Sequence, residues 1–180
     1  MKMPTLATFA LLAALALSGC ATGATTTAAS SAPSGTGSVT ETDGGSCAGV
    51  SVVIDFGPLD ETTITDCAAT GEAATVPAST IVAAAGAKTE GTVQYGDQVV
   101  CRVNGRPSAD ETITVDGVTP FTESCQGMPA AAAYWALWVR PTADADWEYA
   151  QEGLGSLKLK PGQSVGLVFT TGTETPTPGS

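Results

Sequence analysis

The chain has 180 residues, of which 43% are hydrophobic and 14% charged, and its net charge is −11. This length allows a single domain of ordinary size once flexible ends are set aside. Nucleic-acid binding needs a basic surface, so 7 Lys and Arg against 18 Asp and Glu argue against a nucleic-acid partner. The sequence contains no His, which excludes Ser-His-Asp and Cys-His catalytic groups, His-ligated zinc and a histidine pH switch.

The first 20 residues predict an export signal that ends in a lipid-attachment site. Residues 6–17 are mostly apolar, but they are too few to span a bilayer as a helix, which needs about 20 residues. Leu17-Ser18-Gly19-Cys20 matches the bacterial lipobox, and in this the chain resembles exported bacterial lipoproteins. The resemblance implies removal of residues 1–19, a diacylglycerol on Cys20 and anchoring at the outer face of the bacterial cytoplasmic membrane. The alternative is an ordinary signal peptide in which the Cys has no such role.

Two segments have the composition of disordered chain. Residues 20–46 are rich in Thr, Ser, Gly and Ala, and Val39 is their only large apolar side chain. Such a segment cannot bury enough surface to offset its loss of conformational entropy, so we expect a tether between membrane and domain. Residues 171–180 are expected to be disordered by the same reasoning. The folded domain is therefore expected at residues 47–170.

Four cysteines remain once Cys20 is assigned to lipid: Cys47, Cys67, Cys101 and Cys125. In an exported protein an even set predicts two disulfides, for which three pairings are possible. Pairing in sequence order would close loops of about 20 residues and constrain the unfolded chain by roughly 3 kcal/mol each. A metal cluster or a reactive thiol is disfavoured, because neither a Cys-x-x-Cys spacing nor a His occurs, and we predict no metal site.

The remaining sequence predicts several strands and one helix. A β-branched run at residues 50–56 ends at Gly57-Pro58, which indicates a strand. A short helix is expected after Pro77, with Ser79 or Thr80 as its N-cap and Gly86 at its end. Further strands are expected at 92–95, 98–103, 111–115, 133–139, 147–149, 156–160 and 164–170, with turns at Gly96-Asp97, Asn104-Gly105, Asp116-Gly117 and Pro161-Gly162. We therefore predict an α+β fold in which the helix packs on one face of a mixed sheet.

Residues 88–169 carry a series of motifs in a characteristic order. They are Val103-Asn104-Gly105 after a strand, Tyr134-Trp135, Trp147-Glu148-Tyr149, the glycines Gly153 and Gly155, and Leu159 to Val165 before the last strand. In this order the chain resembles the C-terminal domain of transcobalamin and intrinsic factor. The resemblance implies a β-grasp-like fold, a disulfide between Cys101 and Cys125, and a cobalamin-like vitamin as ligand. In transcobalamin a helical barrel covers the other side of the ligand, and the elements predicted here include no such barrel.

Five aromatic residues are the candidate ligand-binding residues: Tyr134, Trp135, Trp138, Trp147 and Tyr149. Alternation along an extended strand directs Tyr134 and Trp138 to one face and Trp135 to the other. A one-sided core cannot hold both tryptophans, so one face should be partly exposed or covered by the 141–155 loop. The functional interpretation is an aromatic platform that stacks on a ligand, and the alternative is core packing under a covering loop.

We expect no catalytic residues and no cofactor. Besides lacking His, the sequence has no Ser-x-x-Lys and no P-loop. The predicted function is that of a monomeric, non-catalytic module, anchored to the membrane by lipid. It would capture a small ligand, handed on to a transporter, or another partner. The alternative is a structural lipoprotein at the cell wall that binds a protein or a glycan.

Overall fold

The computed structural model describes residues 47–174 and 176–179, which form mostly β-sheet with one short helix and two disulfides. The predicted signal segment, Cys20 and the tether lie outside the described residues. No helix in the described part is both long and apolar enough to cross a membrane. The elements are β1 (Val50–Asp55), the 3-10 helix η1 (Gly57–Leu59), β2 (Ile64–Ala68), β3 (Val76–Pro77), α1 (Ala78–Ala84), β4 (Thr89–Thr92), β5 (Gly96–Val103), β6 (Ala133–Arg140), β7 (Glu148–Tyr149), β8 (Lys158–Leu159) and β9 (Ser164–Thr171).

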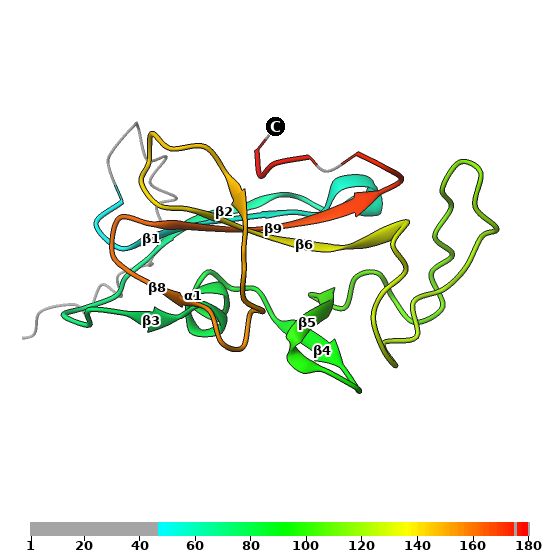
Figure 1. Cartoon of the computed structure of the whole chain (residues 1–180), viewed down its shortest axis with the longest axis horizontal. Helices are drawn as coiled ribbons and strands as arrows, with labels where there is room; N and C mark the ends of the chain where they lie inside the picture. The colour runs from blue at the N-terminus through cyan, green and yellow to red at the C-terminus, as the bar shows by residue number, and fades with distance from the viewer. Residues whose placement is uncertain (1–46, 175, 180) are drawn as a thin grey trace, which may run out of the picture. The chain divides into compact units, whose positions relative to one another are not determined.

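The main sheet has five strands in the order β2-β1-β9-β6-β7. The strands β1 and β9 pair in parallel, and every other neighbouring pair is antiparallel, so the sheet is mixed as predicted. The helix α1 and the two small sheets, β3-β8 and β4-β5, lie on one side of it, whereas the segment after β9 lies on the other (Figure 1).

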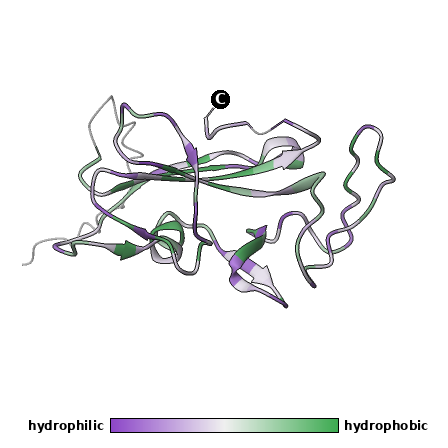
Figure 2. Ribbon diagram, viewed as in Figure 1, coloured by the Kyte–Doolittle hydropathy of each residue, from purple (hydrophilic) through white to green (hydrophobic). Residues whose placement is uncertain are grey.

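The burial of each strand follows from its place in the sheet. In β1, Val50, Val52 and Ile54 are fully buried and alternate with partly exposed residues. The central strand β9 is buried from Ser164 to Thr170, because both of its faces are covered. Hydrophobic residues accordingly gather along the sheet and in α1 (Figure 2). The main core therefore lies between the sheet and α1.

The helix α1 buries one face, made by Ala78, Ile81 and Val82. Gly86, with φ +80°, follows its last turn as predicted. The predicted cap at Ser79 or Thr80 is wrong, because the helix begins directly after β3 and no side chain caps it. The Ala78 N–H donates instead to the Leu157 C=O over 2.9 Å, so tertiary pairing supplies what a cap would have supplied.

The expected strand at 111–115 is wrong. Within this stretch only Ile113 bridges to another residue, Phe121, around a turn at Gly117. The stretch belongs to residues 104–132, which project beyond one end of the sheet (Figure 1). Residues 111–115 therefore have no neighbouring strand with which they could form a ladder. The polar strand β2, which was not predicted, forms because β1 offers it a complete antiparallel ladder.

Of two turns predicted around β5, the structure contains one and lacks the other. Asn104 and Gly105 both have positive φ, 51° and 76°, and Val103 and Arg106 exchange two backbone hydrogen bonds around them. This confirms the predicted turn, since Asn-Gly is the pair that such a conformation favours. The turn expected at Gly96-Asp97 is wrong: residues 93–95 form it, and Gly96 begins β5.

The disulfides pair the cysteines in sequence order. Cys47–Cys67 joins the start of the described chain to β2, and Cys101–Cys125 joins β5 to the projecting segment. Both Cα–Cα distances are 5.6 Å, which is typical of disulfides. The structure thus selects one of the three pairings that the sequence left open.

Candidate functional site

A pocket of about 590 Å³ lies beside β6, and this volume is typical of a small-molecule site. Four segments surround it: the middle of β5, residues 128–131, the first half of β6, and residues 149–154. Its lining residues are Gln98, Val99, Val100, Met128, Pro129, Ala131, Tyr134, Trp135, Ala136, Leu137, Tyr149, Ala150, Gln151, Glu152, Gly153 and Leu154. Apart from the phenols, Glu152 is the one ionisable side chain among them.

Trp135 connects this pocket to the main core. Its ring packs edge-on against Phe56 and Phe169, with centroid distances of 5.3 and 5.5 Å. Its Nε1–H donates to the Arg106 C=O over 3.1 Å. The side chain is 6% exposed, so Trp135 is a core residue that also lines the pocket.

Two tyrosines line the pocket close to each other. The hydroxyl oxygens of Tyr134 and Tyr149 are 3.3 Å apart, and the Tyr149 ring stacks on Trp138 with 4.0 Å between the centroids. The hydrogen bond to Tyr149, followed by burial and the charge of Tyr149, raises the pKa of Tyr134 to about 12. Tyr134 therefore stays a neutral phenol at physiological pH and offers hydrogen bonding without charge.

The outer edge of β6 is only partly covered within the described part of the chain. There β7 pairs with Trp138 and Val139, and the Ala150 N–H donates to the Leu137 C=O over 2.9 Å. Backbone groups of an antiparallel strand alternate between its two neighbours, so Trp135 directs its N–H and C=O toward the same edge as Leu137. No described group hydrogen-bonds to that N–H and C=O. A ligand in the adjacent pocket could use both.

The 149–154 wall of the pocket is held against β5. A Cβ on Gly153 would lie 2.2 Å from the Gln98 carbonyl oxygen, so only glycine permits this approach. The Gly155 N–H donates to the Asp97 C=O over 2.9 Å, and the Ser156 hydroxyl donates to Gln98 Oε1 over 3.0 Å. These contacts hold the Gly-rich connection against β5, so the wall of the pocket is formed without a bound ligand.

The other two candidate residues, Trp138 and Trp147, do not line the pocket. They lie on the face of the sheet opposite the main core, with Ala136 and Val168 in a small second cluster. The Arg140 guanidinium carbon lies 4.7 Å from the centre of the Trp147 ring. The predicted alternation of β6 is thus confirmed. The structure brings Tyr134, Trp135 and Tyr149 together at the pocket and separates the two other tryptophans from it.

The sequence did not indicate several pocket residues. Gln98, Met128 and Leu154 come from three separate segments, and no motif marks any of them. Gly153 was the one available signal, since it lay in the Gly-rich connection.

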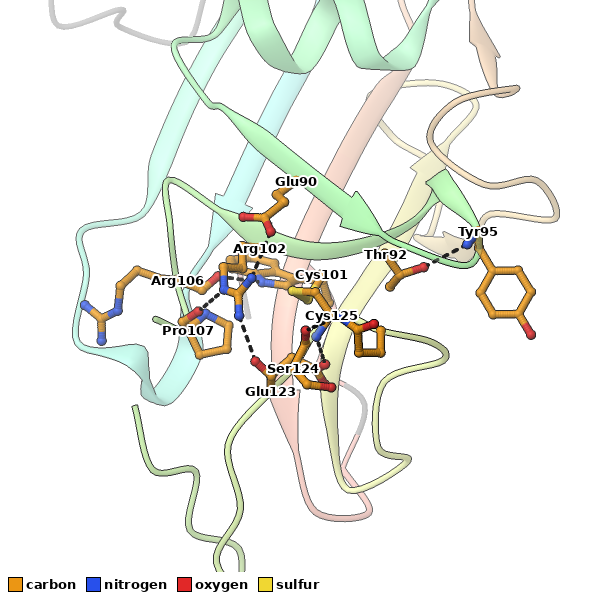
Figure 3. The surroundings of a disulfide bond; sticks show 12 residues. Glu90, Thr92, Tyr95, Cys101, Arg102, Arg106, Pro107, Glu123, Ser124 and Cys125 are labelled. Carbon is orange, nitrogen blue, oxygen red and sulfur yellow. Dashed lines mark hydrogen bonds and ion pairs between the residues drawn. A yellow bond between two sulfur atoms is a disulfide. The ribbon is translucent and has the colours of Figure 1, made fainter. Parts of the chain in front are cut away.

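The segment that carries residues 128–131 is held to β5 by a buried cluster beside the Cys101–Cys125 disulfide (Figure 3). Arg102, which is 8% exposed, directs its guanidinium into this cluster. It donates to the Pro107 C=O over 2.8 Å, to Glu90 over 2.9 Å and to the Glu123 C=O over 2.7 Å. A charged group so placed is stable only because it is paired and hydrogen-bonded.

Two sets of residues resemble reactive sites, but the contacts of their side chains show that they have structural roles. Cys101, Glu123 and Cys125 lie close enough together to suggest metal ligands, but the two sulfur atoms are bonded to each other. Gly162-Gln163-Ser164-Val165-Gly166 has the Gly-x-Ser-x-Gly spacing of a hydrolase nucleophile. Ser164 is buried at the start of β9, its Oγ accepts hydrogen bonds from Arg140, and the sequence offers no His to activate it.

Arg106 forms a second ionic cluster near the base of the projecting segment. It donates to both carboxylate oxygens of Glu111, over 3.0 and 2.8 Å, to Glu61 over 2.7 Å, and to the Leu59 C=O. The hydrogen bond from Arg106 is the main cause of the lowered pKa of Glu111. Both groups are satisfied by each other, which gives this cluster a structural role.

Comparison of the chain with family models, with curated proteins and with solved structures finds no match. What the protein can bind is therefore inferred from the chemistry of the pocket and of the aromatic residues around it.

Proposed function

We propose that the chain is a non-catalytic binding module whose β6 pocket receives a small, uncharged ligand with a largely apolar body. The observation that carries this proposal is the pocket of about 590 Å³ beside the open edge of β6. Val99, Val100, Leu137 and Leu154 supply apolar walls, and the tyrosine hydroxyls with the Trp135 backbone supply hydrogen-bonding groups. Few convergent polar groups in an apolar pocket are the usual features of a ligand site.

The charge of the protein narrows the class of ligand that the pocket can accept. The net charge is −11, and Glu152 is the one carboxylate on the pocket lining. An anionic ligand would enter an unfavourable potential with no cation on the lining to pair with. A neutral ligand that carries amide or hydroxyl groups fits these surroundings best.

The narrower proposals come from the sequence. The lipobox at Cys20 supports a position at the outer face of the cytoplasmic membrane, and two disulfides are compatible with that compartment. The parallel pairing of β1 and β9 at the centre of a mixed sheet, with α1 on one face, supports a β-grasp-like fold. A corrinoid, the ligand class implied by the resemblance to transcobalamin, is accordingly the first probe to test.

A variant that fills the pocket tests the proposal. Ala131 is exposed and lines the pocket, so Ala131→Phe places a ring in it without disturbing the core. Ala143→Phe is the matched control, because Ala143 is exposed but does not line the pocket. Isothermal titration with cyanocobalamin, a neutral dipeptide amide and a neutral disaccharide should show saturable binding of at least one probe. Ala131→Phe should weaken that binding about tenfold or more, and Ala143→Phe should leave it unchanged.

Two results would contradict a pocket function. One is equal binding by both variants, and the other is binding of none of the probes together with firm retention of both variants on isolated cell wall. The second result would favour the structural wall-binding alternative.

A further inference from the structure

The face of the sheet opposite the main core carries its own bound segment. In the register of β6 and β9, Trp138 lies directly opposite Gly166. A Cβ on Gly166 would lie 2.2 Å from Cγ of Pro178 and 3.4 Å from Cζ3 of Trp147. The ring of Pro178 therefore rests on the bare backbone of Gly166 beside the Trp147 ring. Composition predicted disorder for residues 171–180, whereas the structure places Pro178 in a buried position.

The face of the sheet on which Pro178 lies has the aromatic chemistry of a proline-binding site. Trp138, Trp147 and Tyr149 supply aromatic surface: Trp138 stacks on Tyr149, and the Trp147 ring lies under the Arg140 guanidinium. Aromatic-lined grooves are the sites that extended proline-rich segments occupy, because such segments lose little conformational entropy on binding. In the docked segment Pro176 and Pro178 flank Thr177, Pro176 is exposed while Pro178 is buried, and the chain turns at Pro178 and Gly179.

A second observation shows that the resident segment does not supply a hydrogen-bond acceptor for every donor on this face. The Nε1–H of Trp138 is buried and has no hydrogen-bond partner among the described residues. A buried indole N–H normally donates to an oxygen, so this is an unmet donor in the same cluster as Trp147. An extended peptide brings backbone carbonyls, which are the acceptors that this indole lacks.

We propose that the aromatic face formed by Trp138, Trp147, Tyr149 and Gly166 is a recognition site for extended proline-rich peptides. The chain's own residues 176–179 occupy it in the structure. The hydrogen bond from the Thr170 hydroxyl to the Glu174 C=O, 2.6 Å, holds the start of this segment near β9. An external peptide binds by displacing it. The site shares Tyr149 with the β6 pocket, but its other members do not line that pocket, and the proposal does not depend on the function proposed for the pocket.

Two variants of the full chain distinguish an open site from a filled one. Pro178→Ala removes the resident ring and leaves its place on Gly166 empty. Gly166→Ala also expels the ring, but the new methyl group occupies the same place, 2.2 Å from where Cγ lay. Pro176→Ala is the matched control, since that proline is exposed. Indole N–H signals in the NMR spectrum, one for each of the 3 tryptophans, report on the site directly.

The probe is a synthetic peptide of the sequence Thr-Glu-Thr-Pro-Thr-Pro-Gly, titrated into each variant. The Pro178→Ala chain should show a saturable shift of one indole signal to the position of a hydrogen-bonded N–H. A peptide with Ala in place of its second proline should bind about tenfold more weakly or not at all. The Gly166→Ala chain should not respond, and the unmodified and Pro176→Ala chains should respond weakly because their own segment competes.

Equal responses of the Pro178→Ala and Gly166→Ala chains would overturn the proposal, as would an indole spectrum that Pro178→Ala leaves unchanged. Binding that is indifferent to proline in the peptide would overturn it as well. None of these three results decides the function of the β6 pocket, whose test uses other probes and other variants.

Discussion

The two disulfides close loops of similar length but should differ in their effect on stability. Their sequence separations are 20 for Cys47–Cys67 and 24 for Cys101–Cys125. Loop-closure entropy alone assigns about 3.3 and about 3.4 kcal/mol to them, which is the same within the precision of that model. Any larger difference must come from the surroundings of the sulfur atoms in the folded state.

Those surroundings differ clearly. Cys101 and Cys125 are 2% and 4% exposed, whereas Cys67 is exposed and Cys47 is half-buried. Replacing the buried pair with Ala leaves a void in packed surroundings, which adds about 1 kcal/mol to the loss of stability. We therefore expect Cys101→Ala/Cys125→Ala to lower the free energy of unfolding by about 4–5 kcal/mol. Cys47→Ala/Cys67→Ala should lower it by about 3 kcal/mol.

The measurement is urea unfolding of both double variants, followed by tryptophan fluorescence, with hydrogen exchange in native buffer. Exchange in Cys101→Ala/Cys125→Ala should accelerate mainly at residues 124–131. Arg102 still holds the Glu123 C=O, and Arg106 still holds Glu111, so residues 107–123 should change less. The reverse order of stabilities, or losses below about 1 kcal/mol for both, would refute this reasoning and indicate that the reduced chain retains structure when unfolded.

Three further predictions concern single groups. Because Arg106 lowers the pKa of Glu111, the stability from this pair is present above the ordinary value of 4.5 and is lost as the pH falls through the lower folded-state value. Glu111→Gln should therefore cost about 1–2 kcal/mol at neutral pH, and the gap in urea midpoints should narrow in acid; a constant gap would contradict it. Tyr149→Phe should lower the pKa of Tyr134 from about 12 toward 10.0, measured by tyrosinate absorbance, and an unchanged titration would count against the hydrogen bond as its main cause. Cys20→Ala should release the protein from membranes into the medium, and continued membrane retention on cell fractionation would refute the lipid anchor.

Local sequence signals were reliable where the chain itself sets the conformation. Asn104-Gly105 forms its turn because both residues accept positive φ, and the alternation along β6 follows from the two-residue period of an extended strand. The signals failed where a distant partner decides the outcome. The run at 111–115 has strand composition but finds only Phe121 to pair with, and the polar strand β2 exists because β1 lies beside it.

The candidate ligand-binding residues can be divided in the same way, into those that the structure places at the pocket and those that it places elsewhere. Tyr134, Trp135 and Tyr149 could be named from the sequence because aromatic residues clustered near one strand, and the structure places them at the pocket. Trp138 and Trp147 were named for the same reason, yet they lie on the opposite face, where Trp147 and Pro178 both approach Gly166. No sequence pattern predicts that position of Pro178, since two prolines beyond the last strand have no periodicity to reveal which surface they meet.

By itself the sequence determined the class of the domain: an acidic, disulfide-bonded, β-rich unit with one short helix and no histidine chemistry. Composition and the alternation of side chains are local properties, so they can be read along the chain. Only the tertiary structure decided which cysteines pair, that β6 keeps an open edge beside a pocket, and that Pro178 lies on Gly166. Each of these depends on which remote segments the sheet order brings together, and contacts between remote segments leave no local trace in the sequence.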